Sequence, residues 1–212
     1  MHVHSDITQL RNARALIYKL LKYSAVILIC IGLISSHETQ AGEGYKHYVA
    51  KILSNLPAHN AKIRPDLEAY LDALASSARK RAGRAPLTSS AKLKGAARGQ
   101  AADMALGNFV GHHSKSGYRF KKRFSTYAGS EFAGLHGENA ARQRRGGAPN
   151  KAKAAKLFQQ WMNSTRHRRN MMNRAYAYVS TGVIQKGNHL YAVQVFWEKA
   201  SKKPTTNFLV IN

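Results

Sequence analysis

Apolar residues recur at helical spacing in several separate parts of this chain. The first such segment begins at Asp66 and follows the i, i+3, i+4, i+7, i+11 pattern of one helix face, with Leu67, Tyr70, Leu71, Leu74 and Ala78. Pro65 is typical of a helix start and Gly83 of a helix stop. The sequence therefore predicts a helix that begins at Asp66 and ends before Gly83.

Three further segments have a helical pattern. One runs from Ser89 or Ser90 to about Gly107, and its many small residues indicate close packing in the interior. Another covers residues 151–163, with its apolar residues on one face. A short helix is expected where aromatic residues follow an i, i+4, i+7 spacing, at Phe120, Phe124 and Tyr127.

The pattern changes to β-branched and aromatic residues towards the end of the chain. Residues 178–184 and 190–197 read as two strands, and Gly187-Asn188 between them is a turn signal. The two strands together predict an antiparallel hairpin. Helices early in the chain and strands late favour an α+β layered domain.

Residues 1–41 have the layout of a secretory signal peptide. Basic residues precede an apolar run over 25–34, and Thr39-Gln40-Ala41 supplies small residues at a cleavage site. A membrane-spanning helix needs about 20 apolar residues, and this run is shorter. The sequence favours cleavage after Ala41 and a secreted or periplasmic protein. The alternative is a protein that the uncleaved segment anchors to the membrane.

The rest of the chain divides into three parts. Residues 42–65 lack strong periodicity and are expected to form a poorly ordered lead-in, 66–200 form the folded domain, and 201–212 form a C-terminal extension. Cys30 is the only cysteine and lies within the predicted signal peptide. The mature chain would therefore have neither disulfides nor a nucleophilic thiol. A secreted protein of this kind points to a bacterial envelope or medium.

The chain is strongly basic, with a formal net charge of +24. Such a charge attracts polyanions without specifying which one. We find no helix-turn-helix or zinc-finger pattern, so anionic envelope polymers, lipopolysaccharide or a membrane surface fit better than specific nucleic-acid binding. The basic residues are clustered at Arg79-Lys80-Arg81 with Arg84, at Lys121-Lys122-Arg123, at Arg142 with Arg144-Arg145, and at Arg166 with Arg168-Arg169.

Three short sequence motifs supply the residues of an acid/base or cation site. His112-His113 is followed by Gly137-Glu138-Asn139, and then by the segment 161–170, which contains His167. We expect Glu138 to be partly buried and to need a partner, either a histidine or a cation. The alternative is that Glu138 accepts backbone hydrogen bonds and that both histidines make only structural contacts.

Two other histidines are expected outside such a site. His136 and His189 are predicted to be surface or turn residues.

The motifs that contain His112, Glu138 and His167, together with Ala85-Pro86-Leu87 and the segment 101–105, resemble those of the CAP superfamily. This group contains the cysteine-rich secretory proteins, antigen 5 and the plant pathogenesis-related proteins, and the chain is most similar to its disulfide-free bacterial branch. The resemblance runs from about Asp66 to Trp197. It implies a three-layer α/β/α sandwich with a central antiparallel sheet, and a cleft lined by two His and two Glu.

The resemblance also indicates which residues line that cleft. The two histidines fall on His112, with His113 as the fallback, and on His167, while the first glutamate falls on Glu138. Ser164 stands where the family has its second glutamate. A divalent cation such as Zn²⁺ would have His112 and His167 as ligands, but no cofactor is required.

These features favour a binding protein over an enzyme, because most members of the family look like ligand-binding or interaction proteins, and no catalytic residue is assigned. The expected ligand is a small apolar molecule, an envelope component or a partner, held by the cleft and the basic surface. One alternative is a metal-assisted hydrolase in which Glu138 activates a zinc-bound water, although no HExxH or GxSxG motif is present. The other is a protein that binds nucleic acid or lipopolysaccharide as a polyanion.

Overall fold

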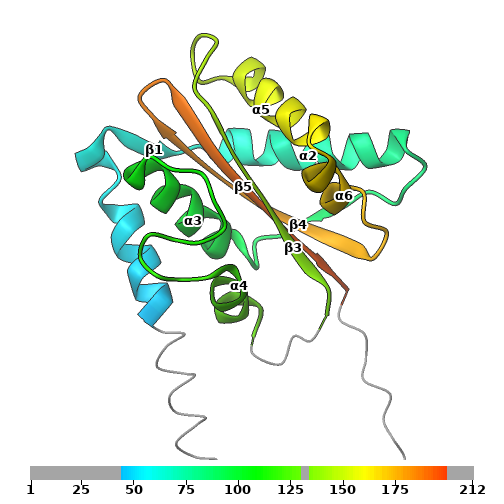
Figure 1. The fold of residues 1–212 in the computed structure, drawn as a ribbon, viewed down its shortest axis with the longest axis horizontal. Helices are drawn as coiled ribbons and strands as arrows, with labels where there is room; N and C mark the ends of the chain where they lie inside the picture. The colour runs from blue at the N-terminus through cyan, green and yellow to red at the C-terminus, as the bar shows by residue number, and fades with distance from the viewer. Residues whose placement is uncertain (1–43, 130–133, 200–212) are drawn as a thin grey trace, which may run out of the picture. The chain divides into compact units, whose positions relative to one another are not determined.

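A five-stranded sheet forms the centre of the fold (Figure 1). The computed structural model describes residues 44–129 and 134–199. Four strands lie antiparallel to their neighbours, in the order β1 (Ala61–Ile63), β4 (Tyr176–Lys186), β5 (His189–Glu198) and β3 (His136–Gln143). The two-residue strand β2 (Thr88–Ser89) pairs parallel with β4. β3 therefore lies at an edge of the sheet, with β5 as its strand partner.

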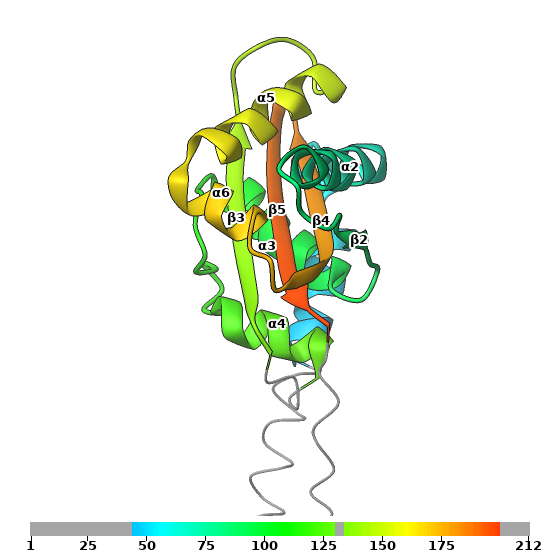
Figure 2. The same cartoon turned by 90° about the vertical axis from the view of Figure 1, so that its right-hand side faces the viewer.

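One face of the sheet is covered by α2 (Pro65–Arg81), α5 (Lys151–Asn163) and α6 (Thr165–Met171). In Figure 2 these helices lie in front of the strands and α3 (Lys94–Gly107) lies behind them. The core on this face joins apolar residues of α2 and α5 to inward-facing residues of β4 and β5, among them Leu67, Leu71, Leu157, Trp161, Val179, Val183 and Phe196.

The opposite face is covered by α3, by α4 (Phe120–Ala128) and by a helix over residues 44–54. Neighbouring strand residues point to this second core, since successive side chains of a strand alternate between its faces. Its members include Leu93, Ala97, Ala101, Met104, Phe124, Ile184, Val193 and Val195. Two helical layers around one sheet make a three-layer α/β/α sandwich, as predicted.

The predicted helices and hairpin are confirmed, and the largest shift of a boundary is at the start of α3. α5 has the predicted limits, and the hairpin of β4 and β5 turns at Gly187 and Asn188. α3 begins at Lys94 rather than at Ser89 or Ser90. The residues before Lys94 pair with β4 instead of joining the helix. Ser89 pairs with Val179, and the Ser90 N–H donates to the Val179 carbonyl at 2.9 Å.

The prediction of a poorly ordered lead-in over 42–65 was wrong for residues 44–65. They form the helix over 44–54, the 3-10 helix η1 (Pro57–His59) and β1. Tyr45, Val49 and Leu56 are buried on the α3 face of the fold. Tyr45 and Val49 have helical spacing, so the pattern was present in a segment too short to stand out.

Several predictions lie outside the described residues. These are the signal peptide over 1–41 with its cleavage site, and the C-terminal extension over 201–212. Within 44–129 and 134–199, no helix is both long enough and apolar enough to cross a membrane.

Candidate functional site

Glu138 lies at the centre of the candidate site and is held by a buried arginine. β3 places the carboxylate inside the fold, where its side chain is 1% exposed. Arg123 of α4 donates from Nη1 to Glu138 Oε2 at 2.7 Å and from Nη2 to Oε1 at 3.0 Å. A paired arginine fork of this kind is among the strongest charge-assisted contacts in proteins. It offsets part of the cost of burying both charges.

His112 joins the same pair from the loop between α3 and α4. Its Nδ1 lies 2.9 Å from Glu138 Oε1, and its carbonyl accepts a hydrogen bond from Arg123 Nη2 at 2.9 Å. Half of the His112 side chain is exposed. Arg123 therefore orients both the carboxylate and the loop that carries the histidine. The neighbouring His113 is exposed, and its backbone pairs with Arg119.

Arg123 is the site residue that the sequence reading missed. It belongs to the basic run Lys121-Lys122-Arg123, which we assigned to the surface charge, yet its side chain is fully buried. A signal was available, because Arg123 stands three residues after Phe120 and one before Phe124, on the same helix face. The aromatic face of α4 therefore also places the Arg123 guanidinium group in the interior of the fold.

His167 lies on α6, and hydrogen bonds connect this helix to β3. Asn139 donates from Nδ2 to the His167 carbonyl at 3.0 Å, and Asn170 donates from Nδ2 to Asn139 Oδ1 at 3.1 Å and to the Glu138 carbonyl at 3.2 Å. Burial lowers the pKa of His167, and the nearby charge of His112 lowers it further. Both effects favour the neutral imidazole over the charged form.

The residues do not fit the zinc site predicted on His112 and His167. Across the described part of the chain, no three His, Cys, Asp or Glu side chains come together as a metal-binding group. Both oxygens of Glu138 are already engaged by Arg123 and His112. At the position where the family has its second glutamate, this chain has Ser164, which supplies a hydroxyl instead of a carboxylate.

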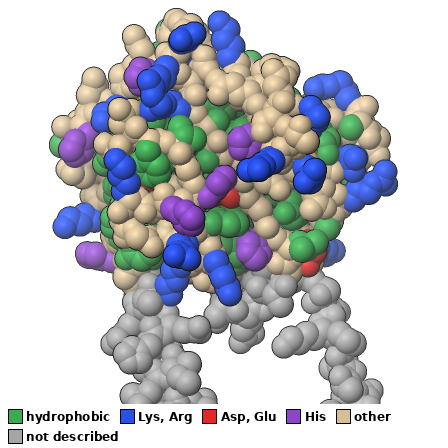
Figure 3. Space-filling view, viewed as in Figure 1, with side chains coloured by type: hydrophobic (Ala, Val, Ile, Leu, Met, Phe, Trp, Pro, Cys, Tyr) green, Lys and Arg blue, Asp and Glu red, His purple; other side chains and the backbone are tan. Residues whose placement is uncertain are grey.

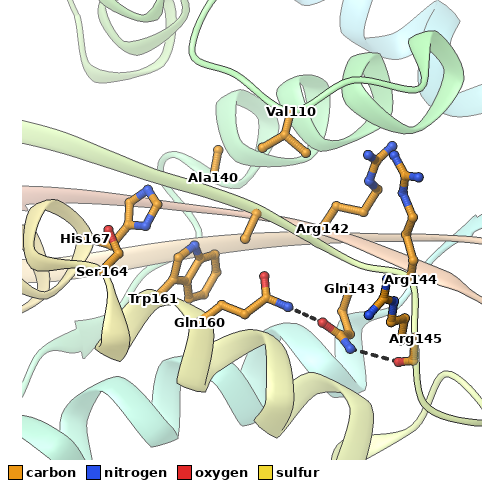
Figure 4. A pocket seen from close by; sticks show the side chains of 11 residues that line it. Val110, Ala140, Arg142, Gln143, Arg144, Arg145, Gln160, Trp161, Ser164 and His167 are labelled. Carbon is orange, nitrogen blue, oxygen red and sulfur yellow. Dashed lines mark hydrogen bonds between the residues drawn. The ribbon is translucent and has the colours of Figure 1, made fainter.

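A pocket of about 480 Å³ opens beside this site, along the free side of β3 (Figure 4). We call it the β3-edge pocket. It contains Ser164 and His167 of the predicted cleft, whereas His112 and Glu138 are outside its lining. The lining consists of Val110, residues 140–145, Gln160, Trp161, Ser164 and His167.

The charge of the β3-edge pocket is entirely positive. Arg142, Arg144 and Arg145 line it, and no acidic residue does. None of the ion pairs formed among the described residues involves these three arginines. Arg142 donates from Nη1 to Asn108 Oδ1 at 2.8 Å, while Arg144 and Arg145 are exposed. Figure 3 shows that Lys and Arg surround this face of the molecule, where little acidic surface is visible.

Trp161 gives the pocket an unused hydrogen-bond donor. The residue is 0% exposed, and its Nε1 finds no acceptor among the described residues. In Figure 4 the indole nitrogen lies on the side of the ring towards His167 and Ala140. Nothing in the spacing of Trp161, which predicts a core residue, indicated this second role.

The other two histidines lie away from the pocket. His136 is the first residue of β3 and its ring stacks on Phe124 with a centroid distance of 4.3 Å, so it is half-buried rather than a surface or turn residue. His189 is the first residue of β5, directly after the hairpin turn.

A three-layer α/β/α sandwich is the fold expected of a CAP domain. Residues 71–197 match the family model of CAP, the cysteine-rich secretory protein family. The chain therefore belongs to this family. No curated protein matches the chain significantly.

Two solved structures share the fold. An extracellular protein containing a SCP domain from Bacillus anthracis is 23% identical, with a TM-score of 0.53 over 63% of this chain and 41% of its own. An outer surface protein from Borrelia burgdorferi is 15% identical, with a TM-score of 0.54 over 64% of this chain and 95% of its own. The match thus spans about two fifths of the Bacillus protein.

Proposed function

We propose that this CAP-domain protein acts outside the cytoplasm as a non-enzymatic binding protein, which holds a small anionic component of the cell envelope in the β3-edge pocket. The observation that carries the proposal is the set of three arginines around a cavity without an acidic residue. Guanidinium groups bind carboxylate and phosphate through paired hydrogen bonds, and these three have no carboxylate partner in the described structure.

The composition of the pocket favours an anion over a purely apolar ligand. Val110, Ala140 and Ala141 give it an apolar side, but most of the other lining residues are charged or can form hydrogen bonds. Burying the Arg144 and Arg145 guanidinium groups and the Trp161 indole N–H against a hydrocarbon would leave them unpaired, at a cost of about 1 to 3 kcal/mol for each. A polar anion satisfies them.

Several features support a place outside the cytoplasm. Residues 1–41 have the layout of a secretory signal, and the two structures of similar fold are described as an extracellular and an outer surface protein. A net charge of +24 would draw such a protein to an anionic envelope.

The proposal assigns no catalytic role to Glu138. A general base must reach the proton that it removes, and the Glu138 side chain is only 1% exposed. Both oxygens of Glu138 accept hydrogen bonds from Arg123, and one also faces His112. The hydrolase alternative has no metal-binding group among the described residues to support it.

Two matched double variants test the proposal with inorganic phosphate as the probe. Arg144→Gln/Arg145→Gln removes two exposed cations from the pocket, and Lys80→Gln/Arg81→Gln removes two exposed cations at the end of α2. Isothermal titration calorimetry at low salt should show an affinity loss of about tenfold or more for the pocket variant, and less than about twofold for the control. Added salt should weaken phosphate binding.

Two results of that titration would count against the proposal. One is the absence of phosphate binding to the wild-type protein. The other is an equal loss of affinity in both variants, which would mean that phosphate responds to the total charge of the molecule and not to the pocket.

A further inference from the structure

The β3-edge pocket has two chemically different ends. Figure 4 shows the guanidinium groups of Arg142 and Arg144 on one side of the view, and Trp161, Ser164 and His167 on the other. The first end is cationic. The second carries an indole N–H, a hydroxyl and an imidazole. A ligand that fills the pocket therefore needs an anionic group and, at a distance from it, a neutral hydrogen-bonding group.

The unpartnered indole nitrogen indicates what the ligand presents at the second end. A buried donor without an acceptor costs free energy, and folded proteins rarely leave one. Trp161 Nε1 is such a donor, and it lies in the wall of an open pocket. An oxygen atom of the ligand is the simplest partner for it.

The groups around Trp161 favour a neutral oxygen over a second charge. Burial lowers the pKa of His167, which favours the neutral imidazole with its one donor and one acceptor. The Ser164 side chain forms no capping hydrogen bond to α6, which leaves its hydroxyl for the pocket. Hydroxyl groups, which both donate and accept, match this set.

The arginine end favours a phosphate monoester over a carboxylate. A monoester carries about −1.5 to −2 charges near pH 7 and has three acceptor oxygens, whereas a carboxylate has one charge and two oxygens. Three guanidinium groups without an acidic neighbour are better balanced by the phosphate.

We infer that the pocket binds a phosphorylated sugar or polyol. Its phosphate lies among Arg142, Arg144 and Arg145, and one of its hydroxyl oxygens accepts the hydrogen of Trp161 Nε1. This inference rests on the proposed function and adds the chemical class of the ligand.

The indole N–H signals in a proton–nitrogen NMR spectrum test this directly. The chain has two tryptophans, so the spectrum of the ¹⁵N-labelled protein contains two such signals, and Trp197→Phe identifies that of Trp161 by elimination. Saturating glucose 6-phosphate should shift the Trp161 signal downfield. Inorganic phosphate should leave it in place, because the phosphate occupies the arginine end only, and glucose alone should bind much more weakly than its phosphate.

Trp161→Phe then measures the contribution of the indole N–H. The variant keeps the aromatic ring and loses the donor, and we expect its affinity for glucose 6-phosphate to fall about tenfold, with the affinity for inorganic phosphate unchanged. If the fold does not tolerate the variant, the wild-type indole signal still decides the question.

A second ligand distinguishes a free phosphosugar from a unit inside a polymer. The methyl phosphodiester of glucose 6-phosphate has one charge less, and it should bind more weakly than the monoester. Equal or tighter binding of the diester would overturn the assignment of a monoester.

The outcomes separate this inference from the function on which it rests. If Arg144→Gln/Arg145→Gln loses phosphate but the sugar phosphate leaves the indole signal unmoved, the pocket binds anions and the phosphosugar assignment fails. If neither phosphate nor sugar phosphate binds, both proposals fail.

Discussion

At the scale of single residues, Arg123 has the largest structural role in the candidate site. It is the only partner that contacts both the Glu138 carboxylate and the His112 carbonyl among the hydrogen bonds found in the described structure. Because Arg123 and Glu138 are both buried, each charge depends on the other. The position of the His112 loop follows from this pair.

We therefore expect Arg123→Met to lower the free energy of unfolding by about 3 to 5 kcal/mol, since it leaves a buried carboxylate with His112 as its only remaining side-chain partner in the described structure. Urea unfolding measures this. Arg119→Met, at the exposed start of α4, is the matched control and should cost less than about 0.5 kcal/mol. A loss for Arg123→Met no larger than for Arg119→Met would contradict this account.

The residues of the site were predictable to different degrees. Glu138 carries one of only 10 acidic side chains and follows a glycine, so its burial and its need for a partner could be anticipated. The partner was also indicated, because Arg123 shares a helix face with Phe120 and Phe124, but we interpreted the run Lys121-Lys122-Arg123 as solvent-exposed charge. Whether the Trp161 N–H has an acceptor depends on the groups that pack against the indole, and only the tertiary structure specifies these.

At the scale of elements, the close contact between α3 and β4 sets the spacing of the layers on that face of the sheet. A Cβ atom added at Gly182 of β4 would lie 2.5 Å from the Ala97 carbonyl carbon and closer still to the Arg98 backbone nitrogen. Neither atom can move without the helix. The small residues of α3 make this approach possible, in agreement with the close packing that its sequence predicts.

Gly182→Ala should consequently destabilise the protein by about 3 kcal/mol or more, because the helix has to move away from the sheet. Thermal or urea unfolding checks this against Gly111→Ala, where the nearest atom to an added Cβ is 3.8 Å away. Similar stability of the two variants would show that α3 does not pack on β4 as described.

The elements with strong periodicity were predictable and the others were not. α2, α5 and the hairpin have long regular patterns, and their predicted limits agree with the structure to within two residues. β3 was missed, because its residues Asn139, Ala140 and Ala141 have low β-propensity. It is a strand because β5 pairs with all of it, from His136 opposite Trp197 to Gln143 opposite Leu190.

At the scale of the whole molecule, the basic charge serves more than one purpose. Arg79 and Arg123, from two of the four basic clusters, are buried, and Arg79 donates hydrogen bonds to the carbonyls of Ala85, Met171, Asn173 and Tyr176. Those charges hold elements together. The cluster of Arg142, Arg144 and Arg145 instead lines a pocket.

A chain with a net charge of +24 attracts anions over its entire surface. The central claim is that anions bind preferentially in the β3-edge pocket. The location of a bound anion is therefore the most direct test. Backbone proton–nitrogen NMR of the labelled protein, titrated with inorganic phosphate at moderate salt, maps that location. We predict that the largest shifts fall on residues 140–145 and on their neighbours in the β3-edge pocket. Larger shifts around Lys80 and Arg81 or around Lys121 and Lys122 would contradict the claim.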